Sequence, residues 1–116
     1  MHRIAVGTEG EGGLDDVVSH RFGRAPKITI VDVDDDGKVV NVRVLDNPGA
    51  SASGGAVVKA IQVLVNEGAD AVVGPAFGPN AQAILEEMKV VNLTVPEGTK
   101  VREAVEAAVR ELRSRS

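Results

Sequence analysis

A short run of apolar residues that ends in glycine, residues 69–74, most constrains the fold of this chain. The run is too uniformly apolar for a strand with one face in water, so we expect a strand covered on both faces, as in parallel sheets. A buried strand between two amphipathic helices predicts an α/β fold. Apolar residues do recur at helical spacing on both sides of the run, namely Val57, Val58, Ile61, Leu64 and Val65 before it and Ala81, Ile84, Leu85 and Met88 after it.

Four further strands and one further helix complete the pattern. We expect strands at residues 3–7, 27–33, 39–45 and 90–95, with residues 34–38 joining the second and third as a hairpin. Residues 101–112 carry the most regular amphipathic pattern, and Thr99 is the expected N-cap of that helix. The order β-β-β-α-β-α-β-α predicts a mixed five-stranded sheet with helices on both faces, in a single domain that spans residues 1–116.

Composition excludes several kinds of site. The 116 residues contain no cysteine, so the isolated chain forms no disulfide, thiolate nucleophile or cysteine-held cluster. A formal net charge of -4 argues against a broad surface for nucleic acid or anionic lipid. No apolar run approaches the ~20 residues of a membrane span, and the N-terminus lacks a signal-peptide pattern, so we expect a cytoplasmic protein that binds neither nucleic acid nor a membrane.

The acidic turn after the second strand matches half of a calcium-binding loop. Residues 32–37 fit the first half of an EF-hand loop, but the twelfth position is Arg43, where calcium needs a bidentate glutamate. No helical patterns flank these residues. We therefore interpret them as an acidic hairpin turn.

A loop rich in glycine and proline follows the buried strand and opens the next helix. Gly74 and Gly78 allow the backbone to approach a ligand closely, Pro79 suits the first helical position, and Asn80 comes directly after it. The unpaired N-H groups at a helix start favour a bound anion. This loop is therefore a candidate binding floor without a catalytic side chain.

A second helix start is a candidate for the same role. Residues 47–55 are small and polar and are expected to form a flexible loop, either a linker or a flap over a ligand, with Gly54 and Gly55 directly before the helix. Ligands of α/β sheets collect at the carboxyl ends of parallel strands, which places residues 7–11 beside residues 74–80.

The basic residues that lie together in a loop are His20, Arg21 and Arg24, with Phe22 and Gly23 between them. An imidazole can ligate a metal, and two guanidinium groups can clamp an anion through charge-assisted hydrogen bonds. The simpler alternative is a solvated basic loop that Phe22 anchors to the core.

Four motifs in a fixed order resemble the dinitrogenase iron-molybdenum cofactor biosynthesis family, the NifX/NafY-like proteins: VSHRFGRAP at residues 18–26, IVD at 30–32, DNP at 46–48 and GPAFGPNA at 74–81. The resemblance covers nearly the whole chain. It implies a ribonuclease H-like α/β fold, and binding of the iron-molybdenum cofactor or its iron-sulfur precursor during delivery to nitrogenase. Many members have histidine directly before the Phe-Gly pair, where this chain has Arg21, with His20 one position earlier.

Residues and resemblance together predict a non-catalytic carrier for an anionic iron-sulfur or iron-molybdenum cluster or its precursor, or for another small anionic ligand, with His20 as the candidate metal ligand. Cluster-assembly proteins are the expected partners. Two alternatives remain open. A nuclease-like phosphoryl-transfer enzyme on the same fold needs clustered carboxylates, for which Glu9 is the nearest acid beyond the first strand. A protein-interaction or regulatory module would use the loop at residues 47–55 to cover a partner.

Overall fold

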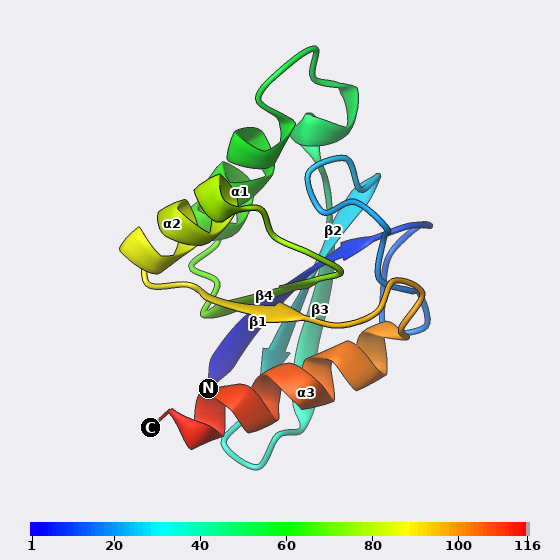
Figure 1. Cartoon of the computed structure of the whole chain (residues 1–116). Helices are drawn as coiled ribbons and strands as arrows, with labels where there is room; N and C mark the ends of the chain where they lie inside the picture. The colour runs from blue at the N-terminus through cyan, green and yellow to red at the C-terminus, as the bar shows by residue number, and fades with distance from the viewer. Residues whose placement is uncertain (116) are drawn as a thin grey trace.

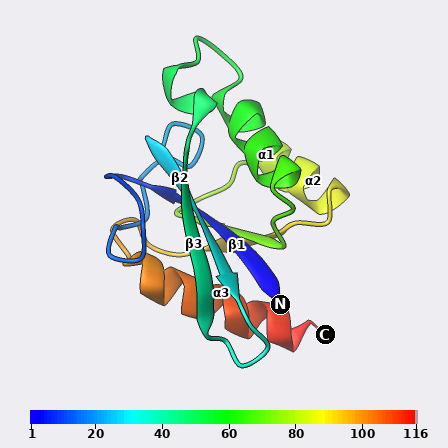
Figure 2. The same ribbon diagram turned by 180° about the vertical axis from the view of Figure 1, so that it is seen from behind.

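The computed structural model describes residues 1–115 and shows a twisted sheet between two helical layers (Figure 1). One helix covers one face and two helices cover the other (Figure 2). The elements in chain order are β1 (His2–Thr8), β2 (Lys27–Val33), β3 (Val39–Asp46), the 3-10 helix η1 (Pro48–Ser51), α1 (Ala56–Asn66), β4 (Ala71–Gly74), α2 (Pro79–Glu87), β5 (Val91–Thr94) and α3 (Val101–Ser114).

The sheet has five strands in the order β3-β2-β1-β4-β5. β2 runs antiparallel to both β1 and β3, whereas β4 runs parallel to β1 and to β5. This arrangement confirms the predicted mixed sheet, the hairpin and the buried parallel strand. Because β1 and β4 are parallel neighbours, their carboxyl ends meet at one edge of the sheet, where the loops after Thr8 and Gly74 both emerge.

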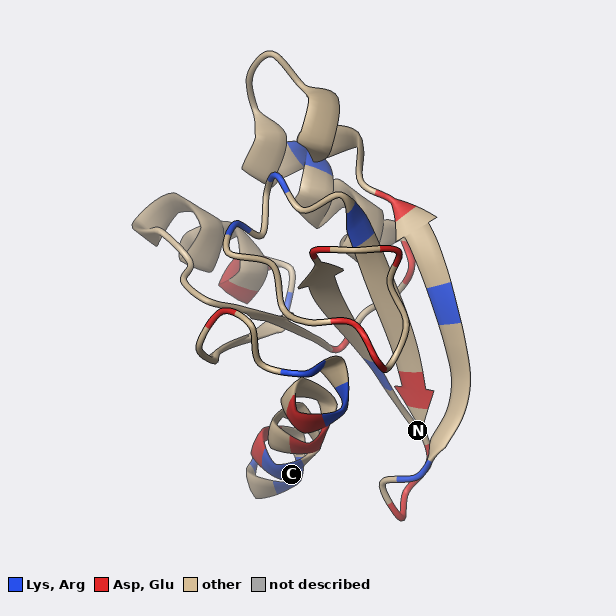
Figure 3. Cartoon of the chain, turned by 90° about the vertical axis from the view of Figure 1, so that its right-hand side faces the viewer, with Lys and Arg blue, Asp and Glu red and all other residues tan. Residues whose placement is uncertain are grey.

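Alternating side chains of the strands build a separate core on each face. Ile4 and Val73 face α3, while Ala5 and Val72 face α1 and α2. All four residues of β4 are buried, as expected for a strand covered on both sides. The apolar stripe of α3 is buried along the whole helix, and acidic and basic residues mix on its exposed side (Figure 3).

Two residues have other roles at the helix ends than the sequence predicts. Thr99 is not the N-cap of α3, because Lys100 takes that position without a side-chain cap and the Thr99 hydroxyl donates instead to the Pro96 carbonyl. Met88 is the C-cap of α2 rather than part of its buried stripe, and its side chain is 49% exposed.

The acidic hairpin turn uses its carboxylates for backbone and side-chain contacts. Asp34 Oδ1 accepts hydrogen bonds from the backbone N-H of Asp36 and Lys38, and Asp32 accepts from Arg3 Nε at 2.7 Å. Among residues 1–115, no three histidines or carboxylates lie close enough together to hold a metal ion. No helix in this described part is long and apolar enough to cross a membrane.

The loop after β1 has a defined shape that depends on Asp16. Its carboxylate accepts hydrogen bonds from the backbone N-H groups of Gly10, Gly12 and Val17, at 2.8 to 3.2 Å. Residues 17 and 18 then form isolated bridges with Lys100 and Thr8, and Ser19 N donates to the Gly7 carbonyl at 2.9 Å. The basic loop that follows therefore starts from a fixed point at the carboxyl end of β1.

Candidate functional site

A pocket of about 300 Å³ opens at the edge where β1 and β4 end. Three segments that are distant in sequence form its walls: the basic loop, the first turn of α1, and the loop that leads into α2. Its lining residues are His20, Arg21, Phe22, Gly23, Arg24, Ala56, Val57, Ala76, Phe77, Gly78 and Ala81.

The two phenylalanines form the apolar floor of the pocket. Their ring centroids are 5.6 Å apart with an interplanar angle of 57°, and both side chains are buried. Gly74 lies beneath them, because a Cβ there would come within 3.1 Å of the Phe77 ring and 3.5 Å of Phe22 Cβ. A Cβ at Gly7 would be similarly close, at 3.3 Å from the Phe22 ring. The predicted residue Gly74 thus supports the floor and does not line the pocket.

Gly23 brings the basic loop into direct contact with the start of α1. A Cβ at Gly23 would lie 3.1 Å from both the backbone N and the Cα of Val57. Gly49 of η1 packs against both the basic loop and the start of α1, since a Cβ at Gly49 would meet the backbone oxygens of Gly23 and Ala56. Close backbone approach explains why glycine stands at both positions.

Asn47 ties the segment 47–52 to the basic loop. Its buried amide donates to the carbonyls of Gly23 and Ala25 at 3.2 and 2.9 Å, and its Oδ1 accepts from Gly49 N at 2.9 Å. Part of the predicted loop is therefore regular structure: residues 48–51 form a short 3-10 helix, and Asn47 ties it to distant carbonyls by hydrogen bonds. Gly54 and Gly55 lie beyond it, exposed and outside the pocket lining.

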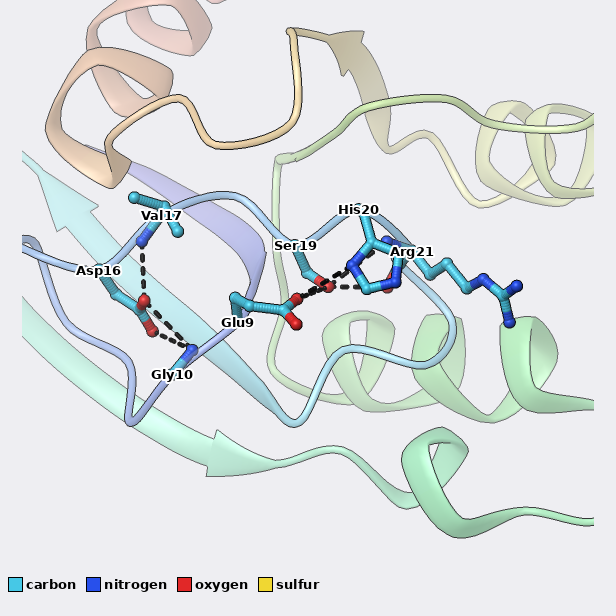
Figure 4. A network of polar contacts seen from close by, with 7 residues as sticks. All are labelled: Glu9, Gly10, Asp16, Val17, Ser19, His20 and Arg21. Atoms are coloured by element: carbon cyan, nitrogen blue, oxygen red, sulfur yellow. Dashed lines mark hydrogen bonds and ion pairs between the residues drawn. The ribbon is translucent and has the colours of Figure 1, made fainter.

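The two arginines of the basic loop differ in their contacts. Arg24 Nη1 donates to the carbonyls of Gly49 and Ala52, so this guanidinium holds η1 while it lines the pocket. Arg21 is exposed, and within the described residues its guanidinium has no hydrogen-bond or ion-pair partner. Figure 4 shows the Arg21 side chain extending away from Glu9. Arg21 is therefore the guanidinium available to an incoming anion.

His20 lies between the pocket and the Glu9 carboxylate. Its Nδ1 is 3.4 Å from Glu9 Oε2, which also accepts a 2.6 Å hydrogen bond from the hydroxyl of Ser19 (Figure 4). The imidazole is 57% exposed.

Two helices begin beside the pocket without a side-chain cap. The N-caps are Gly55 for α1 and Gly78 for α2, and neither helix has an acidic residue in its first turn. Pro79 occupies the start of α2 as predicted, and Asn80 is exposed in the same turn. The first-turn N-H groups are thus free of competing carboxylates, which suits a bound anion.

Five lining residues were not among the predicted site residues, namely Ala56, Val57, Ala76, Phe77 and Ala81. Each is apolar and carries no polar group that could mark it as a binding residue. The spacing of Ala76 and Ala81 around Phe77 and Gly78 in one loop was the available clue.

The sequence model of the family described as "Dinitrogenase iron-molybdenum cofactor" matches residues 2–111. The chain belongs to this family. The family description links its members to the iron-molybdenum cofactor, and it agrees with the resemblance carried by the four sequence motifs. No curated protein sequence gives a significant match to this chain.

Solved structures share the fold over nearly the whole chain. The apo form of the orange protein from Desulfovibrio gigas is 35% identical, with a TM-score of 0.80 over 96% of this chain and 89% of that one. The Thermotoga protein TM1290, described as a candidate NifB protein, is 32% identical, with a TM-score of 0.72 over 95% and 89%. The protein PH0822 shares the fold at 23% identity, with a TM-score of 0.76 over 94% and 91%.

Proposed function

We propose that this chain is a non-catalytic carrier that binds an anionic iron-sulfur or iron-molybdenum cluster, or its precursor, as cargo. The observation that carries the proposal is the pocket in which the basic loop and the Gly-Pro loop meet, in a chain of the iron-molybdenum cofactor family. Both loops carry residues of the four family motifs, at residues 18–26 and 74–81. In the cell, release of the cargo would require contact with cluster-assembly proteins.

The pocket has the chemistry that an anionic cargo needs. Its volume of about 300 Å³ falls at the lower end of small-ligand sites. The floor is apolar, so an anion entering it loses water and interacts more strongly with nearby positive charge. That charge comes from Arg21, from Arg24, and from the uncapped starts of α1 and α2.

Few of the pocket's own atoms can bond to a metal. The chain has no cysteine, and His20 is the one lining residue with an imidazole. A cluster in this pocket would therefore keep most of its own ligands and be recognised by shape and charge, with at most one bond from His20. Arg21 stands where many family members have histidine. At this position the chain therefore offers a positive charge instead of an imidazole.

Anaerobic titration with a synthetic iron-sulfur thiolate cluster, and separately with a tetrathiomolybdate-iron complex, tests the proposal. After each titration the protein is desalted, and absorption spectra and metal content are measured. Retention of about one cluster per chain is the expected result. Protein that emerges colourless and metal-free from both titrations would refute the carrier function.

The enzymatic alternative is tested with the same preparation. A two-metal nuclease needs several carboxylates around one point. Glu9, which contacts the lining residue His20, also accepts a hydrogen bond from the Ser19 hydroxyl. We expect no magnesium- or manganese-dependent cleavage of RNA, DNA or hybrid duplexes. Cleavage that disappears in Glu9→Gln would reverse the assignment.

A further inference from the structure

We infer that Glu9 is a positioning residue for His20: it holds the imidazole by Nδ1 and so leaves Nε2 as the nitrogen that meets the cargo. The inference rests on the proposed function for the identity of the cargo, but the state of the imidazole can be tested without it. Neither the family description nor the structural relatives assign a role to Glu9.

The carboxylate is itself held in place. Glu9 N donates to the Val17 carbonyl at 3.2 Å, which fixes the backbone just beyond β1. The buried Ser19 is fixed in turn by its backbone bond to Gly7, and its hydroxyl donates to Glu9 Oε2 at 2.6 Å. A hydrogen bond of this length to a charged acceptor is strong. Oε2 of Glu9 is therefore held in place by contacts that do not involve His20.

His20 sits next to this oxygen and borders two hollows. On one side is the pocket, with Arg21 and Phe22. On the other is a shallow hollow of about 260 Å³ that contains Glu9 and Glu97. Oε2 of Glu9 is 3.4 Å from Nδ1 of the ring. Nδ1 of the imidazole thus contacts the carboxylate, and His20 also forms part of the pocket wall.

The chemistry of the two groups determines which nitrogen carries the proton. An ionised carboxylate only accepts hydrogen bonds, and a neutral imidazole has one N-H donor and one acceptor nitrogen. With Nδ1 facing Glu9, the proton belongs on Nδ1 and the lone pair on Nε2. Histidines that bind metals typically donate their other N-H to a carboxylate or carbonyl, which fixes the ring and strengthens the bond.

The first experiment measures the tautomer of His20 in the apo-protein. His2 is replaced by glutamine so that one imidazole remains, and ¹⁵N chemical shifts of the ring are recorded in alkaline buffer. We expect the Nδ1-H form to predominate in the parent. In Glu9→Ala the population should move toward Nε2-H, while Glu97→Ala should match the parent.

Glu97 is the matched control because it lines the same hollow and carries the same charge. Both acids are exposed, so the fold should survive each change, and the backbone amide spectrum checks this. Two results would overturn the inference: a parent that is mainly Nε2-H, or equal shifts in both variants, which would show a general effect of charge.

The second experiment measures affinity for the synthetic iron-sulfur cluster. Loss of a carboxylate that orients a metal-bound histidine typically weakens binding by about 10- to 100-fold. We expect a loss of this size in Glu9→Ala and little change in Glu97→Ala. A parent that binds no cluster would refute the proposed function, and the tautomer would still decide the role of Glu9. A parent that binds and a Glu9→Ala variant that binds equally well would refute the positioning role alone.

Discussion

The ring of Phe22 packs against the ring of Phe77, with 5.6 Å between the ring centroids. Phe22 comes from the basic loop after β1, and Phe77 comes from the loop after β4. They are the only aromatic residues in the chain. Their contact joins the two loops that form the candidate site, because Gly7 and Gly74 leave room for the rings directly above the strand ends.

Phe22→Ala should therefore destabilise the protein by about 3 to 5 kcal/mol, the usual cost of emptying a buried aromatic site. Phe22 is only 4% exposed, so little of this cost can be recovered by hydration. Urea denaturation followed by circular dichroism measures the loss. Phe22→Leu is the control, since it keeps most of the apolar volume and should lose clearly less. Equal stability of Phe22→Ala and Phe22→Leu would contradict this prediction, because it would show that the apolar volume at this position contributes little.

Arg21→Gln should weaken binding of the synthetic iron-sulfur cluster without changing stability. Arg21 lines the pocket and has no partner within the described residues, so no internal contact is lost. A hydrogen bond to a charged group contributes about 1.5 to 3 kcal/mol, which corresponds to a loss of about tenfold or more in affinity. The dependence of affinity on salt should also become weaker.

Arg110→Gln is the matched control for this change. Arg110 is exposed on α3, at the other face of the sheet, and its substitution removes the same charge from the whole protein. If both variants bound the cluster with the same reduced affinity, the effect would come from net charge and not from the pocket.

Asp32→Asn should cost stability at neutral pH but not in acid. Arg3 donates to Asp32, and this hydrogen bond holds the pKa of the Asp32 carboxyl below its ordinary value. A carboxyl with a lowered pKa stabilises the fold above its unfolded pKa of about 3.9, and the contribution disappears as the pH falls through the folded pKa.

Urea denaturation of both proteins at a series of pH values measures this effect. The difference in unfolding free energy should be about 1 to 3 kcal/mol at neutral pH and should shrink below about pH 4. A difference that stays the same from neutral pH down to acid would contradict the proposed role of the Arg3 contact.

The strands and helices could be predicted because their signals are local. Period-two and helical patterns depend on neighbouring residues, and the buried strand 71–74 also predicted the edge where the site lies. The shape of the site could not be predicted in this way. Asn47 reaches residues more than 20 positions earlier in the chain, and nothing in the small, polar sequence around it indicates that contact.

Contacts between residues that are distant in sequence also explain the other differences between the predicted and the observed structure. Thr99 has the right chemistry for a helix cap, but its carbonyl accepts from Val18 and its hydroxyl turns to Pro96, so the helix begins after Lys100. Arg24 and Arg21 look equivalent in sequence. Only the structure separates them, because the carbonyls that engage Arg24 belong to a distant segment.

Gly49→Ala should disturb the site more than any change at the glycines that precede α1. A Cβ at Gly49 would lie 2.5 Å from the backbone oxygen of Ala56 and would also meet the backbone oxygen of Gly23. Both atoms are main chain from other segments, so neither can rotate away, and the pocket walls must move apart. Overpacking of this kind typically costs about 1 to 3 kcal/mol. Cluster affinity should fall with it, since Gly23 is part of the pocket lining.

Gly54→Ala is the matched control and also a test of the sequence interpretation. Gly54 was a candidate binding residue, yet a Cβ there would have no atom within 4 Å, and its backbone is not in the left-handed region. The substitution should leave stability unchanged or raise it slightly, by up to about 1 kcal/mol, because alanine restricts the unfolded chain. Cluster affinity should equal that of the parent. Weaker binding in Gly54→Ala would place the cargo against the loop before α1, and equal behaviour of the two variants would show that the walls around Gly49 are not tightly packed.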